Sequence, residues 1–521
     1  ELKVNLAGYK AVVVPAMYTM RSTTLALLRT FKKNGGIVVF ADRIPHLVDA
    51  TPSEEVQAFA ATCDEFETLN DTVRNISITD ETGTEIPAIL YQRRTYDDSN
   101  EAVFICNTSD SETRENVLDQ NLVRERQDKF NSVRITYVTP IRGGVIEVVP
   151  ETGERTLKNA RYIDGSYVFD TSFDIFQSRI FMVTSDEDVL ADVRVEQEDV
   201  TTAVTELDLG CYEITLNEPN VLVLDRARYR FDSGDWQPSA YNLFIDRDAR
   251  IEIDIPRRGD HMAQPWTVTP EPAPASIAVE LEYTFAIETA PENGLQFAIE
   301  KPELYTVQVN GSQLLLDSDR GYWVDDSLRL FDLPIGLLKQ GSNTIVLKTS
   351  ITAFHPGLES IYLLGDFGVR IDGLDLSLIE PPRQLSLGDW VAQGLPFYSG
   401  AVSYACTFNY AKTDGERVYL KLTDVNASCV AVHVNGQKAG VAAWAPWEVD
   451  ITEFLGNGED RLELKLYSHR RNSHGPLYQN DPRPKGTNPK TFLEYNDRYA
   501  LVSCGLNVSP RIEIKTEKYS E

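Results

Sequence analysis

Cysteine and histidine are scarce in this sequence, which has six of each in 521 residues. The cysteines form no CxxC pair, so neither a zinc ribbon nor a thioredoxin-type redox motif is encoded. No HExxH motif occurs, which argues against a zinc hydrolase. We expect free thiols, mostly buried or half-buried, at Cys63, Cys106, Cys211, Cys406, Cys429 and Cys504.

Positive charge is also in short supply. Lys and Arg number 50 against 79 Asp and Glu, which gives a net charge of −29. Such a chain repels phosphate backbones and anionic lipid at long range, so we expect neither nucleic acid nor a membrane as partner. No apolar run approaches the ~18 residues of a membrane-spanning helix. The 42% of hydrophobic and 25% of charged residues are typical of globular domains, and the length suggests three or four of them.

The first residues, Glu1-Leu2-Lys3, contain no initiator Met and no signal-peptide pattern. A β-α-β pattern begins almost at once. We therefore expect the chain to be a piece of a longer protein, and its localisation is left undecided.

Residues 11–40 carry that β-α-β pattern. Residues 11–14 and 37–40 are short apolar runs typical of buried parallel strands. Between them, apolar residues at helical spacing predict a helix over 23–33, which the Asn-Gly-Gly at 34–36 ends. Neither GxGxxG nor GxxxxGK[ST] is present, so nucleotide binding is not expected.

From about residue 75 the pattern changes to short alternating strands with turn residues every ten positions or so, for example at 75–79, 102–106 and 145–149. The fold class predicted is mostly β and multidomain, with tandem β-sandwiches of jelly-roll, galactose-binding-like type after a small α/β remnant. Residues 267–275 are expected to be an extended crossing segment, and 381–383 a second boundary. The expected division is a partial α/β module at 1–74, a β-sandwich at 75–190, a jelly roll with an N-terminal extension at 191–380 and a second jelly roll at 381–521.

An internal repeat supports the last two of these domains. Val-Gln-Val-Asn-Gly at 307–311 recurs as Val-His-Val-Asn-Gly at 432–436, offset by 125 residues. A strand followed by Asn-Gly indicates a hairpin, because both residues tolerate the positive φ angles of a type I′ turn. Later parts of the two copies are offset by 117 or 118 residues. We expect two related domains.

The repeated pattern V-x-V-N-G, D-[IL]-x-x-x-L and G-x-N resembles the jelly-roll sandwich of family 2 glycoside hydrolases and galactose-binding-like modules. Further segments resemble the C-terminal half of large bacterial glycosidases of the α-L-rhamnosidase group, namely 220–225, 264–266, 299–302, 322–325, 361–369, 394–400 and 471–476. This resemblance implies that a (β/α)8 catalytic barrel comes first and that a small α/β module and several sandwiches follow.

No catalytic residue is assigned to this chain. The resemblance implies catalytic carboxylates in a barrel, and a barrel needs eight strand–helix pairs over about 250 residues, where this sequence has one β-α-β unit. Glycoside hydrolysis uses two carboxylates about 5 to 9 Å apart. Glu300 and Asp366 are of interest because each adjoins apolar strand sequence. The alternative is that both make structural hydrogen bonds or ion pairs.

Sugar binding needs aromatic faces and forked polar groups, and such residues gather at 390–398 and 444–478. For each aromatic, packing in a core or at an edge is the competing interpretation. The polar run 469–474 is interpreted as a loop that meets either another domain or a ligand. We expect it on the surface, with Arg471 and Asn472 turned toward a concavity shared with 390–398. The candidate carbohydrate-binding residues are Trp390, Tyr398, Trp444, Trp447, His469, Arg471, Asn472 and His474.

The function predicted is that of an accessory region of a glycoside hydrolase, which supports an upstream barrel and binds glycan. The alternative is a stand-alone carbohydrate-binding or adhesin-type protein. The partners expected are therefore carbohydrate or a barrel domain. No cofactor is predicted, and a structural calcium ion stays open, because scattered oxygen ligands leave no sequence motif. The run 487–490 is interpreted as a surface loop.

Overall fold

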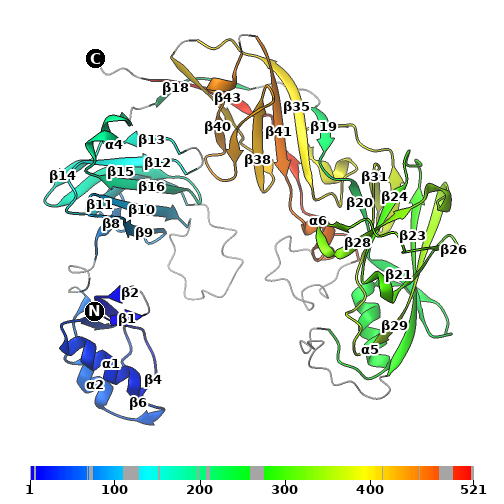
Figure 1. Cartoon of the computed structure of the whole chain (residues 1–521), viewed down its shortest axis with the longest axis horizontal. Coiled ribbons are helices and arrows are strands. Elements are labelled where there is room, and N and C mark those ends of the chain that lie inside the picture. The colour runs from blue at the N-terminus through cyan, green and yellow to red at the C-terminus, as the bar shows by residue number, and fades with distance from the viewer. Residues whose placement is uncertain are drawn as a thin grey trace. The chain divides into compact units, whose positions relative to one another are not determined.

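The computed structural model describes residues 2–517 apart from 5–6, 67–68, 70–73, 109–127, 151–152, 196–198, 207–211, 259–274, 414, 457 and 480–496. The residues described form two compact units, one within 2–195 and one within 199–517. Strands dominate both units (Figure 1), so the predicted multidomain β-sandwich class is confirmed. The expectations for Cys211, 264–266, 487–490 and nearly all of 267–275 lie outside the described residues.

The N-terminal part contains the predicted β-α-β unit. Strands β3 (Ala11–Val14) and β5 (Ile37–Phe40) pair in parallel, and helix α1 (Ser22–Lys33) connects them. Gly35 follows the helix with φ of 80°, the left-handed conformation that ends helices. One face of α1 packs a small core through Leu25, Leu28 and Phe31. The other elements are β1 (Leu2–Val4), β2 (Ala7–Tyr9), β4 (Thr19–Met20), β6 (Leu47–Val48), β7 (Thr51–Pro52) and α2 (Glu55–Ala60).

The first sandwich packs a six-stranded sheet against a four-stranded sheet. Its strands alternate buried and exposed side chains, and the buried ones form one core. The strands expected at 75–79, 102–106 and 145–149 are confirmed as β8 (Ile76–Thr79), β10 (Asn100–Asn107) and β12 (Gly144–Val148). In sheet order the strands are β17 (Arg194–Val195), β13 (Arg155–Leu157), β12 (Gly144–Val148), β16 (Ser178–Thr184), β10 (Asn100–Asn107) and β9 (Ile89–Thr95), then β14 (Arg161–Ile163), β15 (Ser166–Phe173), β11 (Phe130–Val138) and β8 (Ile76–Thr79), with helix α4 (Glu187–Ala191).

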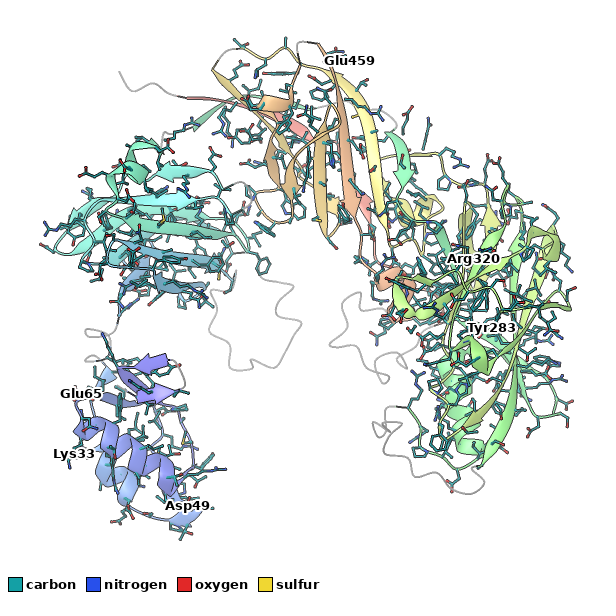
Figure 2. The ribbon with its side chains drawn as sticks, in the orientation of Figure 1. Lys33, Asp49, Glu65, Tyr283, Arg320 and Glu459 are labelled. Atoms are coloured by element: carbon teal, nitrogen blue, oxygen red, sulfur yellow. The ribbon has the colours of Figure 1, made fainter. Side chains whose placement is uncertain are left out.

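The middle sandwich contains the largest core, between a five-stranded and an eight-stranded sheet. Tyr283 lies within it (Figure 2) and donates a hydrogen bond of 3.1 Å to Oδ1 of Asn242. The first sheet contains β20 (Asn220–Leu224), β30 (Ile361–Gly365), β24 (Leu295–Glu300), β28 (Asp325–Leu333) and β27 (Tyr322–Trp323). The second contains β22 (Gln237–Tyr241), β21 (Arg226–Phe231), β23 (Ser276–Ile287), β29 (Gly341–Thr352), β25 (Thr306–Val309), β26 (Ser312–Leu314), β32 (Asp375–Ile379) and β31 (Gly368–Asp372). Short 3₁₀ turns are η3 (Pro302–Leu304) and η4 (Ile335–Leu337).

Helix α5 (Asn242–Glu252) also covers this core and was not predicted from the sequence. Its buried face includes Asp246 and Arg250, which form an ion pair of 2.9 Å with both side chains almost fully buried. Two charged residues on the inner face break the apolar 3.6-residue period on which helix prediction depends.

The last sandwich has its own core between a four-stranded and a six-stranded sheet. Strands β18 (Asp199–Glu206) and β19 (Tyr212–Leu216) belong to these sheets although they precede the middle sandwich in sequence. The domain boundaries expected at 75, 191 and 381 stay predictions. The other strands are β43 (Arg511–Glu517), β36 (Glu416–Lys421), β40 (Glu448–Asp450), β33 (Gln384–Leu385), β35 (Ala401–Asn409), β41 (Glu459–Tyr467), β38 (Cys429–Val434) and β39 (Gln437–Ala442), with a small sheet of β34 (Gly388–Asp389), β42 (Gly505–Leu506) and β37 (Val425–Asn426). Its short helical elements are η5 (Trp390–Gln393), η6 (Thr452–Phe454) and α6 (Arg471–His474).

The predicted repeat is visible in the strand order of these two sandwiches. The middle sandwich contains the series β23-β29-β25-β26, and the last contains β35-β41-β38-β39. The Asn-Gly turn has φ of 49° and 84° at Asn310 and Gly311, and 52° and 78° at Asn435 and Gly436. Positive φ at both central residues defines a type I′ turn, so both hairpins are confirmed.

Candidate functional site

The middle and last sandwiches meet around the turn that follows η5. The side-chain amide of Asn220, which is buried, donates to the carbonyl oxygens of Phe367 at 2.7 Å and Gly394 at 3.2 Å. The backbone N–H of Val369 donates to the same Gly394 oxygen at 2.9 Å. Gly394 has φ of 91°, a conformation that favours glycine. These bonds fix the 391–396 segment against hairpin β31–β32.

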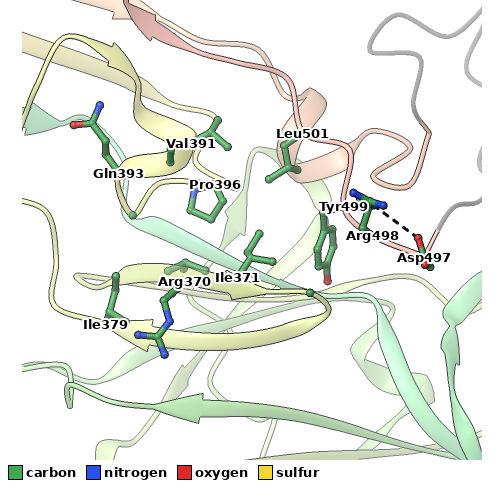
Figure 3. Close-up of a pocket in the computed structure, with 14 residues that line it drawn as sticks. Arg370, Ile371, Ile379, Val391, Gln393, Pro396, Asp497, Arg498, Tyr499 and Leu501 are labelled. Carbon is green, nitrogen blue, oxygen red and sulfur yellow. Dashed lines mark ion pairs between the residues drawn. The ribbon is translucent and has the colours of Figure 1, made fainter.

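A hollow of about 910 Å³ lies beside this contact. Figure 3 shows Gln393 and Pro396 on one side of it, Tyr499 and Arg498 on the other, and Ile371 between them. This volume is within the range of small-molecule sites, which are mostly apolar with a few polar groups. The apolar lining residues are Val369, Ile371, Ile379, Val391, Ala392, Pro396 and Leu501.

Charged side chains also line the hollow. Arg370 pairs with Glu288 through two hydrogen bonds, one of them 2.7 Å long. Arg498 lies 3.9 Å from Asp497, and both are strongly exposed. Sugar hydroxyl groups pair with such forked donors and acceptors. Gln393 is less available to a ligand, because its side chain already bonds the backbone of Ser386. Its Oε1 accepts from the Ser386 N–H at 2.9 Å, and its Nε2 donates to the Ser386 carbonyl at 3.2 Å.

Tyr499 is the aromatic wall of the hollow. Its ring stacks on Tyr478 at 5.0 Å between centroids and meets Phe397 edge-on at 5.2 Å. Its hydroxyl donates to Oδ1 of Asp225 at 3.1 Å. Burial, and next the charge of Asp225, raise the pKa of Tyr499 well above its ordinary value. The hydroxyl group of Tyr499 is therefore neutral, and the contacts with Tyr478, Phe397 and Asp225 hold its ring in place.

Asp225 is 1% exposed and accepts a second hydrogen bond, of 2.9 Å, from the hydroxyl of Tyr478. Both bonds go to Oδ1, and Oδ2 has no hydrogen-bond partner. Burial raises the pKa of Asp225 to about 6, against the lowering effect of the two tyrosine hydroxyls. This carboxylate was not predicted as a site residue. Its position in the sequence, directly after an entirely buried strand, could have indicated that it is buried.

The run 469–474 does not line the hollow, and its expected surface position is wrong for Asn472. Residues 471–474 form helix α6, and Asn472 is 0% exposed. Its side chain donates to the carbonyl of Val502 at 2.8 Å and accepts from the N–H of Val502 at 2.8 Å. Arg471 is half-buried, with its guanidinium nitrogens buried. The Asn472 side chain can be buried because backbone groups from a distant part of the chain form its hydrogen bonds.

Two neighbours in this run also make structural contacts. Nε2 of His469 lies 3.4 Å from Sγ of Cys504, whose pKa burial raises to about 11. Arg470 forms a two-pronged ion pair with Glu218 at 2.8 and 2.5 Å. The expected free thiols are confirmed for the five cysteines that the structure describes, of which Cys504 is buried and the other four are half-buried.

His474 lies among aromatic rings of the middle sandwich. It stacks on Tyr362 at 5.3 Å and contacts Trp323 at 5.1 Å between ring centroids. Nδ1 lies 2.6 Å from Oγ of Ser473. Burial lowers the pKa of His474 to about 4, so the imidazole is neutral at physiological pH.

The four aromatic candidates are dispersed. Trp390 and Tyr398 are buried in the core of the last sandwich, with ring centroids 6.3 Å apart. Trp447 is half-buried against the same core. Trp444 is 46% exposed. Sugar contact stays a prediction for all eight candidates, and of these four aromatic rings Trp444 presents the most surface to solvent.

The two candidate carboxylates have different surroundings. Asp366 is exposed and pairs with Arg383 at 2.7 Å, as the structural alternative predicts. Glu300 is half-buried, and its pKa is raised by burial and then by the charge of Glu359. Glu359 itself pairs with Arg258 at 2.5 Å.

In the part of the chain that the structure describes, no group of three or more His, Cys, Asp or Glu side chains is arranged to hold a metal ion. None of the helices described is long and apolar enough to cross a membrane.

Comparison with known proteins gives similarities to glycosidases. No protein-family model matches the chain. A curated protein of Formosa agariphila named "Putative beta-glucuronidase" is 30% identical over 125 residues, which are 23% of this chain and 11% of that protein. The rhamnosidase structure from Novosphingobium sp. PP1Y is 14% identical with a TM-score of 0.41, covering 96% of this chain and 33% of that one.

A β-glucuronidase structure from Ruminococcus gnavus is 12% identical with a TM-score of 0.19, over 50% of this chain and 42% of that one. The chain thus spans a minor part of each of these proteins. Their names belong to the class that the sequence motifs resemble.

Proposed function

We propose that this chain is an accessory β-sandwich region of a glycoside hydrolase-like protein, and that it binds glycan in the hollow between its middle and last sandwiches. The observation that carries the glycan part is the hollow itself. It combines the Tyr499 ring with two guanidinium groups and a carboxylate over an apolar floor. A pyranose presents the matching chemistry, because its C–H faces pack on aromatic rings and its hydroxyl pairs bond forked polar groups.

The accessory part is supported by the resemblance of the sequence motifs to the region that follows a catalytic barrel. The coding sequence that precedes Glu1 tests it. We expect eight strand–helix pairs there, with two carboxylates at strand ends. The second candidate function, a stand-alone carbohydrate-binding protein, is favoured by the same hollow and predicts no barrel in that sequence.

A ligand panel tests the glycan part. Methyl rhamnoside, glucuronide and mannoside, and oligosaccharides that contain them, are titrated into the chain by calorimetry and saturation-transfer NMR. Ala392→Trp places an indole in the hollow from an exposed lining position. Ala411→Trp is the matched control, because Ala411 is exposed in the same unit and does not line the hollow.

We expect at least one glycan to bind the wild type and the control, and to lose at least tenfold in affinity with Ala392→Trp, which is about 1.4 kcal/mol. Absence of binding across the panel contradicts the glycan proposal. Equal binding by both tryptophan variants places the ligand outside the hollow and contradicts it too.

A further inference from the structure

Strand β31 lies at an edge of its sheet, and that edge borders the hollow. Among the described strands, β32 is the one that pairs with it. An edge strand carries backbone N–H and C=O groups that point away from the sheet. Val369 and Ile371 of this strand line the hollow, and Figure 3 shows Ile371 between Pro396 and Tyr499. The direction of the backbone groups of β31 therefore decides what this wall offers a ligand.

The register of the β31–β32 hairpin gives that direction. Asp372 pairs with Asp375 across a turn of two residues. The residues that flank such a turn exchange both backbone hydrogen bonds, and along an antiparallel pair every second residue does the same. Arg370 therefore bonds β32 through its backbone. Val369 and Ile371 lie between these positions, so their N–H and C=O groups point outward from the hairpin.

An observed contact agrees with this direction. The N–H of Val369 donates outside the hairpin, to the carbonyl of Gly394 at 2.9 Å. Ile371 follows two residues later, so its N–H and C=O leave the strand on the same side. No residue that the structure describes forms a hydrogen bond with these two groups. Backbone groups without a protein partner are bonded by water or by a ligand.

We propose that the main chain of Ile371 is the polar anchor of the hollow, and that it binds two adjacent hydroxyl groups of a neutral pyranose. A hydroxyl group both donates and accepts, so one hydroxyl accepts from the N–H and its neighbour donates to the C=O. The inference rests on the proposed function, because it takes glycan as the ligand of the hollow. It adds the specificity-determining residue and the class of sugar.

The charges at the rim favour a neutral sugar. Arg370 makes two hydrogen bonds to Glu288, and Arg498 lies 3.9 Å from Asp497. Each of these guanidinium groups thus faces a carboxylate, which leaves N–H groups for hydroxyls but little net positive charge for an anion. The net charge of −29 repels an acidic glycan at long range as well.

Ile371→Pro tests the anchor. Proline removes the outward N–H and leaves the ladder to β32 intact, because proline is tolerated on the free side of an edge strand. Ile371→Val is the matched control, since it keeps the N–H and a β-branched apolar side chain. The probe is the neutral methyl glycoside, rhamnoside or mannoside, that binds the wild type more tightly in calorimetry. We expect about tenfold weaker binding by Ile371→Pro and wild-type affinity for Ile371→Val. Equal affinity of all three proteins overturns the anchor.

Monodeoxy analogues of that glycoside separate hydrogen bonding from a structural effect of proline. The analogue that lacks the hydroxyl bonded to the N–H should bind the wild type about tenfold more weakly than its parent. The same analogue and its parent should bind Ile371→Pro equally, because the donor is absent there. If each analogue loses the same factor in both proteins, the anchor is overturned. If Ile371→Pro does not fold, hydrogen exchange of the wild-type Ile371 amide decides, and a rate that saturating glycoside leaves unchanged overturns it.

The sugar class is tested in the same titrations. Methyl glucuronide should bind about fivefold more weakly, or worse, than the best neutral glycoside, and equal or tighter binding overturns the preference for a neutral sugar. The outcomes also separate this inference from the proposed function. If Ala392→Trp blocks binding and Ile371→Pro does not, the inference alone fails. If no glycan binds the wild type, the proposed function fails and the inference fails with it.

Discussion

Asn310 and Asn435 occupy the same position in two successive sandwiches and make the same hydrogen bonds. Each begins a type I′ turn, at φ of 49° and 52°. Each side-chain amide donates to the carbonyl of a 3₁₀ turn, that of Leu337 at 2.9 Å and that of Phe454 at 3.0 Å. The two sandwiches are therefore equivalent here in their side-chain hydrogen bonds as well as in their backbone conformation.

The partner residues are equivalent too. Asn310 donates to Oδ1 of Asn343 at 2.8 Å, and Asn435 donates to Oδ1 of Asp460 at 2.7 Å. The latter oxygen also accepts from the N–H of Gly456 at 2.8 Å. Asn343 and Asp460 are separated by 117 residues, the offset at which the sequence indicated the second part of the repeat.

Asn310→Ala and Asn435→Ala should each destabilise their sandwich by about 2 to 3 kcal/mol. Alanine loses the hydrogen bonds and is strained at positive φ. Asn435→Gly should cost less, because glycine accepts the turn conformation. Denaturant titration with circular dichroism measures these losses. Asn409→Ala, at an exposed position, is the control, and a loss there as large as at the turns would contradict this account.

Asn472→Ala should lower the free energy of unfolding by about 2 to 4 kcal/mol. It leaves both backbone groups of Val502 without their partner in a buried position. Thermal unfolding of the chain is the measurement. Asn472→Asp keeps an acceptor for the Val502 N–H and loses the donor, so it should also destabilise the fold. An unchanged melting temperature for Asn472→Ala would restore the surface position predicted from the sequence.

The neutral His474 ring makes the fold sensitive to acid. Its pKa is about 4 when buried and 6.5 when exposed, so the unfolded chain binds the proton first. The stability that it contributes is present above pH 6.5 and is lost as pH falls toward 4, by about 3 kcal/mol. His474→Phe keeps a ring against Tyr362 and cannot take the proton. The stability difference between variant and wild type should therefore shift in favour of the variant between pH 7 and pH 4.5, and parallel profiles would contradict this.

Glu300 should not act as a catalytic acid in this chain. Its raised pKa suits such a role. Two carboxylates act on it. Glu359 is paired with Arg258, and Asp325 accepts hydrogen bonds from the backbone N–H and the hydroxyl of Ser327, so both are engaged in structural contacts. We expect no turnover of nitrophenyl rhamnosides, glucuronides or galactosides by the purified chain. Hydrolysis that Glu300→Gln abolishes would show that the prediction is wrong.

Much of this architecture follows from short stretches of sequence. The β-α-β unit at 11–40 was predicted from apolar periods and from the Asn-Gly-Gly that ends its helix, since local backbone preferences decide helix ends. The two hairpins were predicted from Asn-Gly for the same reason. Alternation of apolar and polar residues predicted the strands. The sequence repeat at 307–311 and 432–436 predicted the pair of related sandwiches.

Helix α5 and the run 469–474 were not predictable in this way, because polarity was taken as a guide to exposure. Burying a polar side chain is unfavourable only when it finds no partner. Asp246 finds Arg250, and Asn472 finds the backbone of Val502. The second of these partners comes from another segment of the chain, which a local pattern does not contain.

The candidate site was decided by tertiary structure. Residues 391–394 and 396 of the segment 390–398 line the hollow, whereas Arg471 and Asn472, which the sequence predicted to share a concavity with that segment, do not. The wall opposite it depends on Tyr499 meeting Asp225 across 274 residues. Sequence by itself determined which residues form strands and turns, because those choices depend on neighbours along the chain. Only the packing of two sandwiches placed a carboxylate behind an aromatic ring, because desolvation and hydrogen bonding depend on what lies beside a group in space.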